Sequence, residues 1–498
     1  MREVLEIWNG EAVPAGEVPV ISVARFQAIV SEVLAAGGRM SALFGRPAPS
    51  GRVLVTAVLT DDPEGRLGLL ATEVDRRWPS LAARCPALQA FERELCEQYG
   101  VVPDGHPWLK PLRFEPERRA VPEGTGMPGD YPFFQVEGEE IHEVAVGPVH
   151  AGIIEPGHFR FQCHGEKVIH LEIALGYQHR GLERLLEGGP ARKSLRLAES
   201  VAGDTAVGHA LAYCRSLEAL AGVEAPPRAS YLRGIALELE RLANHVGDLG
   251  MLAGDVGFQP TAAACGALRA EFLNATAEIC GNRFGRGLVV PGGVRFDLAP
   301  DEAVRLSVKV NRAFERVREA ASLFFESASA RNRTDGTGVV SRELCDALGL
   351  VGPAARACGA SRDVRRDHPF GVYRFAHLPV ATADTGDVFA RAWVRWLEAE
   401  RSSAFVAERL GTLPEGPVRL EVPPLPPERL AVSLVEGWRG EIAHVALTHE
   451  EGRIERYKVV DPSFHNWMGL ALALRGEQVS DFPLCNKSFN LSYAGHDL

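Results

Sequence analysis

Residues 198–209, Ala-Glu-Ser-Val-Ala-Gly-Asp-Thr-Ala-Val-Gly-His, place a carboxylate and an imidazole at the start of an apolar helix. Ala202 and Gly203 leave space beside the backbone, and Asp204 stands where the first free N–H groups of a helix accept a carboxylate. His209 follows about one and a half turns later. The pattern is typical of a capped helix and equally of an active-site wall, in which Asp204 and His209 are the catalytic candidates.

A second line of polar groups lies in the helix expected after Pro227. Its buried stripe is predicted from apolar residues three and four apart: Leu232, Ile235, Leu239, Leu242 and Val246. Glu238, Arg241 and His245 run along one edge of that stripe. Such a line can conduct protons, but a solvated or interhelical ion-pair face is an equal alternative.

The composition excludes several classes of protein. The 498 residues exceed one ordinary core, and 46% apolar with 24% charged residues is the balance of a folded, soluble protein. The net charge of −11, with no cluster of Lys and Arg, argues against nucleic acid as a partner. We expect no secretion signal and no membrane-spanning segment, so that any membrane link goes through partners. Nine cysteines without a C-x-x-C pair suit reduced, buried thiols.

The elements that position these residues fall into two domains of an α+β protein. Residues 1–114 read as a small α+β domain, with a helix over 23–36, a hairpin of strands 52–60 and 66–74, and a helix ending at Gly100. Residues 115–138, rich in Pro, Gly and charge, are the predicted linker. Residues 139–498 begin with strands at 142–146, 158–163 and 167–174 and continue as helices over 193–221, 228–250, 262–281, 302–328 and 387–410. A hairpin at 441–458 completes a mainly helical domain with a small antiparallel sheet.

Short motifs in both domains carry a family resemblance. Trp78-Pro-Ser-Leu81, Phe91-Glu-Arg-Glu-Leu95 and Gly105-His-Pro107 resemble the thirty-kilodalton-type subunit of respiratory complex I. The second domain resembles the large subunit of membrane-bound (group 4-type) nickel–iron hydrogenases and the quinone-site subunit of complex I. The matching stretches in it are residues 147–161, 176–183, 238–245, 290–294, 333–338 and 436–441. The resemblance implies the hydrogenase-large-subunit fold fused to a complex I domain.

The metal ligands of that family are missing here. A nickel–iron centre needs four thiolates, which the family supplies as two C-x-x-C pairs. The first pair falls on Ala202 and Thr205, and the second falls on Pro483 and Asn486, beside the lone thiol of Cys485. We therefore expect no nickel–iron centre and no cofactor firmly bound by this chain.

The resemblance also assigns roles to single residues. The histidine and tyrosine that hold a quinone in complex I fall on Pro156 and Gly203, so His150 and His158 become the catalytic candidates in the loop, against a structural alternative of hydrogen bonds to backbone. His179 and Arg180 would lie near a partner subunit's iron–sulfur cluster; the alternative for Arg180 is an ion pair with Glu183 or Glu187.

Two further charged residues complete the candidate site. Glu183 is a weak metal candidate, or a proton-path or structural carboxylate. Arg439 overhangs the metal in hydrogenases, and here it is expected to pair with Asp204 or Glu436.

The expected function is that of a core subunit in a membrane-associated, complex I-like or hydrogenase-related oxidoreductase. Electron transfer at a partner's iron–sulfur cluster would drive proton or ion translocation. The implied partners are a small iron–sulfur subunit, a ferredoxin-like subunit, a membrane anchor and antiporter-like subunits. We expect the chain itself to be peripheral, held by these partners on the cytoplasmic side of the membrane. The alternative is a reductase of quinone or another small acceptor, using NAD(P)H-derived electrons. The missing cysteines disfavour a third reading, a true hydrogenase.

Overall fold

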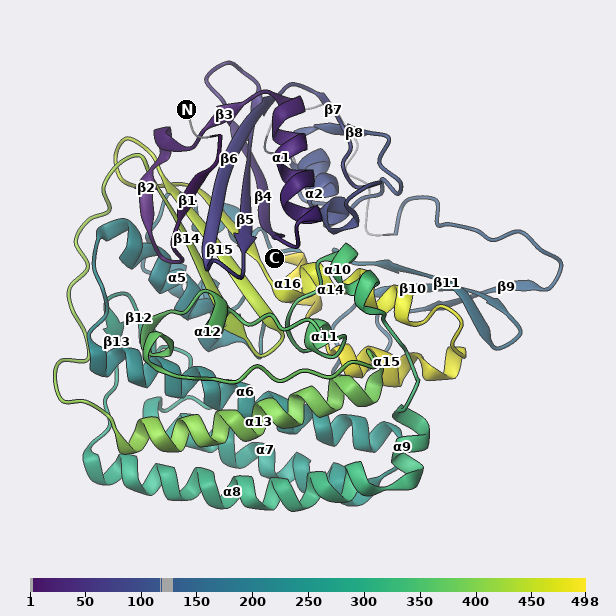
Figure 1. Ribbon diagram of the computed structural model, residues 1–498, viewed down its shortest axis with the longest axis vertical. Coiled ribbons are helices and arrows are strands. Elements are labelled where there is room, and N and C mark those ends of the chain that lie inside the picture. The colour runs from purple at the N-terminus through teal and green to yellow at the C-terminus, as the bar shows by residue number, and fades with distance from the viewer. Residues whose placement is uncertain (1–2, 117, 119–128) are drawn as a thin grey trace.

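The computed structural model describes residues 3–116, 118 and 129–498. Most of the predicted linker, residues 117 and 119–128, lies outside the described residues. Figure 1 shows a sheet with two helices at the N-terminal end, a layer of long helices at the opposite end, a second sheet between them, and a three-stranded sheet that projects from the body. The α+β fold class is confirmed.

The N-terminal module is a five-stranded sheet covered by two helices. Its strands follow the order β1 (Leu5–Ile7), β6 (Arg66–Val74), β5 (Val53–Asp61) and β4 (Arg39–Pro47), and β3 (Val20–Ile21) pairs with β6 in parallel. The helices are α1 (Val23–Ala35) and α2 (Gln89–Tyr99). Gly100 ends α2 at φ 63°, a left-handed conformation that glycine adopts without strain. Two short strands, β7 (Arg77–Pro79) and β8 (Val102–Asp104), pair beside them.

A strand from the N-terminal segment belongs to the central sheet. This sheet has the order β16 (Ile454–Val460), β15 (Gly440–Thr448), β14 (Arg429–Gly437) and β2 (Ala12–Pro14). Buried contacts reinforce the attachment, since Arg39 bonds Glu441 at 2.8 Å and Lys458 bonds Glu94 at 2.5 Å. The two halves of the chain therefore share a continuous core.

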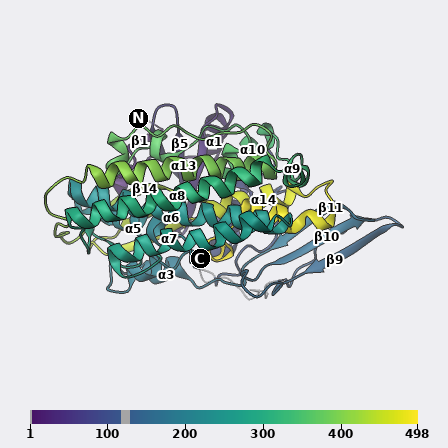
Figure 2. The same ribbon diagram turned by 90° about the horizontal axis from the view of Figure 1, so that it is seen from below.

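The long helices form one layer, which Figure 2 shows side by side from below. They are α6 (Pro227–Asp255), α7 (Gln259–Cys280), α8 (Pro300–Glu326) and α13 (Val388–Gly411), with α5 (Ala206–Ala221) between α6 and the central sheet. The predicted stripe of α6 is confirmed, because each of its five apolar residues is fully buried. In the described residues, no helix has the length and apolarity that a membrane span requires.

One predicted helix is wrong. The stretch 193–221 is divided into α4 (Ser194–Ala198) and α5, with a turn over residues 199–205. The Arg180 guanidinium donates to the carbonyls of Ser200 and Val201 in that turn, at 2.6 and 3.0 Å. These carbonyls are thus satisfied without a continuing helix.

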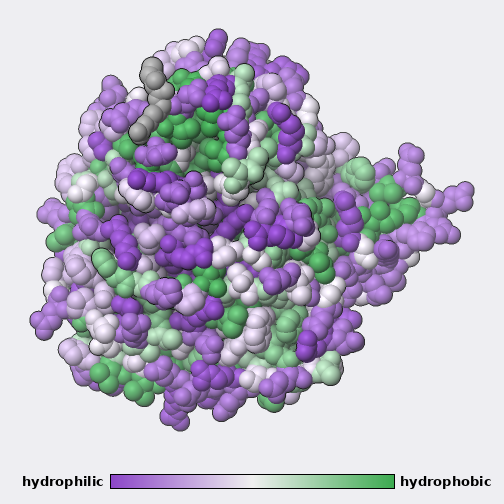
Figure 3. All heavy atoms as spheres, in the orientation of Figure 1, coloured by the Kyte–Doolittle hydropathy of each residue, from purple (hydrophilic) through white to green (hydrophobic). Residues whose placement is uncertain are grey.

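The projecting sheet consists of β9 (Ile141–Val146), β10 (His158–His164) and β11 (Lys167–Ala174). Figure 3 shows apolar surface on this projection, and the exposed large apolar residues near it include Phe134, Val149 and Ile153. The remaining elements are short: α3 (Leu182–Leu186), β12 (Val289–Val290), β13 (Gly293–Val294), α9 (Ala328–Thr334), α10 (Arg342–Leu348), α11 (Gly352–Arg356), α12 (Val364–Asp367), η3 (Gly371–Phe375), α14 (Pro462–Ala473), α15 (Phe482–Phe489) and α16 (Tyr493–Asp497).

Candidate functional site

A bidentate ion pair joins the 199–205 turn to the β14–β15 turn. The two terminal nitrogens of Arg439 contact the two carboxylate oxygens of Asp204 at 2.6 and 2.8 Å. Trp438 supports the pair, because its ring stacks on the Arg439 guanidinium and its indole N–H donates to Asp204 O and Thr205 Oγ1, both at 3.1 Å. The predicted pairing of Arg439 is confirmed, with Asp204 as the partner.

Arg439 also reaches the C-terminal segment. Its Nε donates to the carbonyl of Asn490, at 2.5 Å, directly after α15. Burial opposes the ionisation of Asp204, but the guanidinium outweighs it and holds the pKa of Asp204 below its ordinary value. Arg439 therefore connects the 199–205 turn with the C-terminal segment, the two segments that supply the metal ligands in the nickel–iron hydrogenases that this chain resembles.

The residues present do not fit a nickel–iron centre. Ala202 offers a buried methyl group, and Thr205 offers a hydroxyl oxygen that already accepts from Trp438 and Arg439. Cys485 packs against Gly338 and Arg391, and burial raises the pKa of its thiol to about 12. Thiolates are the ligands that such a centre requires, and this set of groups supplies none in the turn.

His209 belongs to a buried chain of hydrogen bonds behind the ion pair. Its Nδ1 lies 3.1 Å from His444 Nε2 and its Nε2 lies 3.0 Å from Asp461 Oδ2. His444 Nδ1 is in turn 2.8 Å from the hydroxyl of Tyr457. Asp461 also caps α14 by accepting from the backbone N–H of Ser463, at 2.8 Å. His209 is thus held by two neighbours, and it lies in the protein interior.

His150 and His158, the two candidate histidines of the loop, differ in how many of their ring nitrogens have hydrogen-bond partners. His158 has both ring nitrogens occupied, since Nδ1 lies 3.3 Å from Gly147 O and Nε2 accepts from Arg160 at 3.2 Å. His150 Nδ1 lies 3.2 Å from Pro148 O, and its buried Nε2 has no hydrogen-bond partner among the described residues. The His150 ring packs against those of Phe159 and Tyr493. His150 is the one of the two with a free nitrogen.

Arg180 makes no ion pair with Glu183 or Glu187 in the structure. Its guanidinium donates to four carbonyl oxygens: those of Gln178, Ser200, Val201 and Ala494. His179 Nδ1 lies 2.8 Å from the carbonyl of Asp497. The exposed Arg180 therefore joins the 199–205 turn to α16, and among the described residues its guanidinium donates hydrogen bonds to carbonyl oxygens and not to a carboxylate.

Glu183 is a structural carboxylate at the junction of the two halves of the chain. It lies 2.8 Å from Arg456, 3.1 Å from Lys458 and 3.5 Å from Arg118. Burial opposes its ionisation, and the surrounding cations overcome that effect and hold the pKa of Glu183 well below its ordinary value. Its oxygens are occupied, which leaves no free face for a metal.

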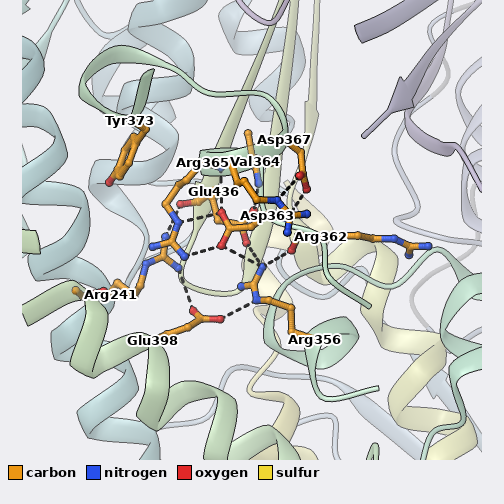
Figure 4. Close-up of polar contacts among 12 residues, drawn as sticks. Arg241, Arg356, Arg362, Asp363, Val364, Arg365, Asp367, Tyr373, Glu398 and Glu436 are labelled. Atoms are coloured by element: carbon orange, nitrogen blue, oxygen red, sulfur yellow. Dashed lines mark hydrogen bonds and ion pairs between the residues drawn. The ribbon is translucent and has the colours of Figure 1, made fainter. Parts of the chain in front are cut away.

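A buried charge network lies beside the β14–β15 turn (Figure 4), and we call it the Arg356 network. Arg356 contacts Glu398 at 2.7 Å and Glu436 at 2.8 Å, and Glu398 accepts from His245 at 2.9 Å. The other members are Glu238, Arg241, Asp363, Arg365, Tyr373 and Ser402. Arg241 also donates to the carbonyls of Glu436 and Gly437, at 2.7 and 3.0 Å. The polar edge of α6 is therefore an interhelical ion-pair face, and its solvated alternative is wrong.

The charges of the Arg356 network do not cancel. It contains three guanidiniums and four carboxylates, namely Arg241, Arg356, Arg365 and Glu238, Asp363, Glu398, Glu436. Burial lowers the pKa of His245 to about 4, so this ring is neutral at pH 7. Burial, with the charge of Asp363, raises the pKa of Glu436 to about 7. Glu436 is thus the carboxylate of the network whose proton affinity is raised toward neutral pH.

Glu240 is a second carboxylate with a raised pKa, next to the ion pair. It accepts from the backbone N–H groups of Val207 and Gly208, at 2.7 and 3.1 Å, at the start of α5. Burial, with the charge of Asp204, raises the pKa of Glu240 to about 8. Sequence reasoning missed Glu240 and the partners of Arg356. The one signal in the sequence that pointed to the Arg356 network was the placement of Glu238, Arg241 and His245 beside a buried stripe.

The fold therefore combines a helical layer, a projecting three-stranded sheet and an N-terminal α+β module. Two family models match the chain: "Respiratory-chain NADH dehydrogenase, 49 Kd subunit" over residues 255–432, and "Respiratory-chain NADH dehydrogenase, 30 Kd subunit" over residues 43–132.

Individual relatives agree with these models. The carbon monoxide-induced hydrogenase of Rhodospirillum rubrum is 34% identical over 70% of this chain and 97% of its own length. Formate hydrogenlyase subunit 5 of Escherichia coli is 31% identical over 93% of this chain and 85% of its own. A chain of the archaeal membrane-bound sulfane sulfur reductase has the same fold, with a TM-score of 0.68 and 23% identity over 74% of this chain and 100% of that one.

The chain belongs to the family that unites the large subunits of membrane-bound hydrogenases with the 49-kDa subunit of respiratory NADH dehydrogenase, and it also carries the 30-kDa subunit's domain. The predicted family is confirmed. Its relatives are subunits of membrane-bound, multisubunit complexes.

Proposed function

We propose that this chain is the core coupling subunit of a membrane-associated oxidoreductase and works without a nickel–iron centre of its own. It links electron arrival at a partner's iron–sulfur cluster to proton or ion movement. The observation that carries the proposal is the bidentate Asp204–Arg439 pair, which occupies the turn where the family places metal ligands. The partners are a small iron–sulfur subunit, a ferredoxin-like subunit, a membrane anchor and antiporter-like subunits. These partners hold the chain peripherally on the cytoplasmic side of the membrane.

Arg180 provides the electrical link in this proposal. Its guanidinium donates to carbonyl oxygens, two of which belong to the 199–205 turn. A reduced cluster beside it adds negative charge, which raises the pKa of nearby carboxyl groups through space. Glu436, with a pKa of about 7, is the group whose protonation responds most to such a rise near neutral pH, whereas Glu240, with a pKa of about 8, already holds its proton there.

Asp204→Asn in the intact complex tests the coupling. We expect electron transfer from the donor to continue and the number of ions moved per electron to fall, since Arg439 loses its counter-charge. The control is Arg305→Gln, which removes an exposed guanidinium on α8. An Asp204→Asn complex that assembles fully and translocates ions at the wild-type ratio would contradict the proposal.

The second candidate function is reduction of a quinone or another small acceptor. The free, buried Nε2 of His150 favours it, because a ring nitrogen without a partner can bond the oxygen of a quinone head group. His150→Ala should then raise the KM for quinone, whereas Val149→Ala, at the exposed neighbouring position, should not. An unchanged KM in the His150 variant would remove this candidate. Stoichiometric nickel together with hydrogen turnover in the purified complex would overturn both proposals.

A further inference from the structure

A cavity of about 260 Å³ lies away from the Asp204–Arg439 pair, between α5, the start of α6 and η3. Its lining includes three arginines, Arg215, Arg233 and Arg374, and two glutamates, Glu218 and Glu224. Apolar lining is supplied by Leu211, Val223, Phe370 and Val372. The cavity thus combines cationic groups with an apolar surface, which suits a small organic anion.

Two of these arginines are already neutralised. Arg233 bonds both carboxylate oxygens of Glu218, at 2.5 and 3.0 Å, and also donates to the carbonyls of Val290 and Gly293. Arg374 contacts Glu224 at 2.7 Å, and both of those side chains are exposed, at 42% and 74%. Both glutamates are therefore paired with other arginines, and neither of them is a hydrogen-bond partner of Arg215.

Arg215 is held in place by neutral groups. Its Nε and one terminal nitrogen reach Ser433 Oγ and Asn9 Oδ1 at 3.4 Å, the long limit of a hydrogen bond. The guanidinium lies 4.9 Å from the centroid of the Phe370 ring. Gly10, at φ 85°, has no side chain, and a Cβ there would come within 2.8 Å of Arg215 Nη2. Burial lowers the pKa of Arg215 to about 10, which is still far above neutral pH.

We propose that this cavity binds a small molecule through a carboxylate or phosphate group, with Arg215 as the principal cation. A guanidinium presents up to five N–H donors in a planar fork that matches two oxygens of such a group. Arg374, at the rim, can take a second oxyanion by exchanging its exposed contact with Glu224. The apolar lining accommodates a short carbon body. The site is independent of the proposed coupling function.

Chemical labelling of the wild-type chain tests the proposal without requiring a variant to fold. Phenylglyoxal modifies accessible guanidiniums. Peptide mass spectrometry measures the fraction of Arg215 that is modified, and the exposed Arg305 serves as the internal control. Succinate, inorganic phosphate and neutral succinamide are added in turn at millimolar concentration. We expect succinate or phosphate to protect Arg215 and to leave Arg305 unchanged. Protection by succinate alone assigns a carboxylate ligand, and protection by phosphate alone assigns a phosphate ligand.

Two variants measure the contribution of Arg215. Arg215→Gln should weaken binding of the protecting anion about tenfold or more, which is the loss expected for a charge-assisted hydrogen bond. Arg215→Lys keeps the charge and should lose less. The proposal is overturned if neither anion protects Arg215, or if succinamide protects it equally. It is also overturned if Arg215 is already protected in the intact complex without added anion, because an acidic group of a partner subunit then fills the cavity.

Discussion

The Asp204–Arg439 pair and the Arg356 network share the turn between β14 and β15, yet they differ in exposure and in charge. The Asp204 side chain is 34% exposed, and its one cationic partner balances it. The members of the Arg356 network are at most 7% exposed, and its carboxylates outnumber its guanidiniums. A buried network of this kind fixes geometry and contains the carboxylate that titrates near neutral pH, whereas the single pair at the edge of the interior is more open to solvent.

The difference explains how Arg439 is held in position by protein groups. Arg241 bonds the carbonyls of Glu436 and Gly437, and Glu436 bonds Arg356, so the strand leading to Trp438 and Arg439 is fixed from the interior. The Asp204 carboxylate then needs only to meet a preorganised guanidinium. We infer that the network holds the β14–β15 turn rigid and that the pair is the more solvent-accessible of the two charge clusters.

The largest expected effect comes from removing the centre of the network. Arg356→Met leaves Glu398 and Glu436 buried without their main cation, and the free energy of unfolding should fall by about 3–5 kcal/mol. The matched control, Arg342→Met, removes a half-exposed arginine paired with Asp346 and should cost less than about 1 kcal/mol. Urea unfolding measures both. Equal losses in the two variants would break the proposed contrast between buried and exposed pairs.

An intermediate effect is expected from the proton on Glu436. The folded pKa of about 7 lies above the ordinary value of 4.5, so the folded state binds more protons between these two values. The free energy of unfolding therefore falls as pH rises through that window, by about 3 kcal/mol when the shift is fully expressed. Glu436→Gln cannot titrate and should lose this decline.

The measurement is urea unfolding at intervals from pH 5 to pH 8. The control variant is Glu319→Gln, on the exposed face of α8, which should retain the wild-type slope. A Glu436→Gln variant with the same slope as wild type would place the extra proton elsewhere.

The sequence predicted local structure well because local structure depends on nearby residues. The apolar spacing in α6, the hairpin at Asp61 and the glycine end of α2 are short-range signals, and the structure has all three. The helix start predicted within 198–209 is confirmed, but the helical range 193–221 ran across the turn at 199–205, because the turn's decisive partner, Arg180, lies outside the segment.

The candidate site depended on contacts that no spacing reveals. Glu238 and Arg241 indicated that charge lay beside a buried stripe, and buried charges must find partners. The partners, however, lie more than one hundred residues away in short helices and a strand, as with Arg365 and Glu436. The family resemblance supplied the Asp204–Arg439 pairing as one of two alternatives, and only the structure separated them, since Glu436 bonds Arg356 instead.

The smallest expected effect is the coupling energy between Asp204 and Arg439. A double-mutant cycle with Asp204→Asn and Arg439→Gln should give about 1 kcal/mol, because solvent reaches the carboxylate and weakens the attraction. The coupling energy, measured by urea unfolding, should become smaller still in 1 M salt, where the screening length falls to about 3 Å. The cycle for Arg356→Met with Glu436→Gln should change little under the same conditions, because both side chains are buried. Equal sensitivity to salt in the two cycles would mean that the Asp204–Arg439 pair is as closed to solvent as the network, and that it could not sense a charge outside the chain.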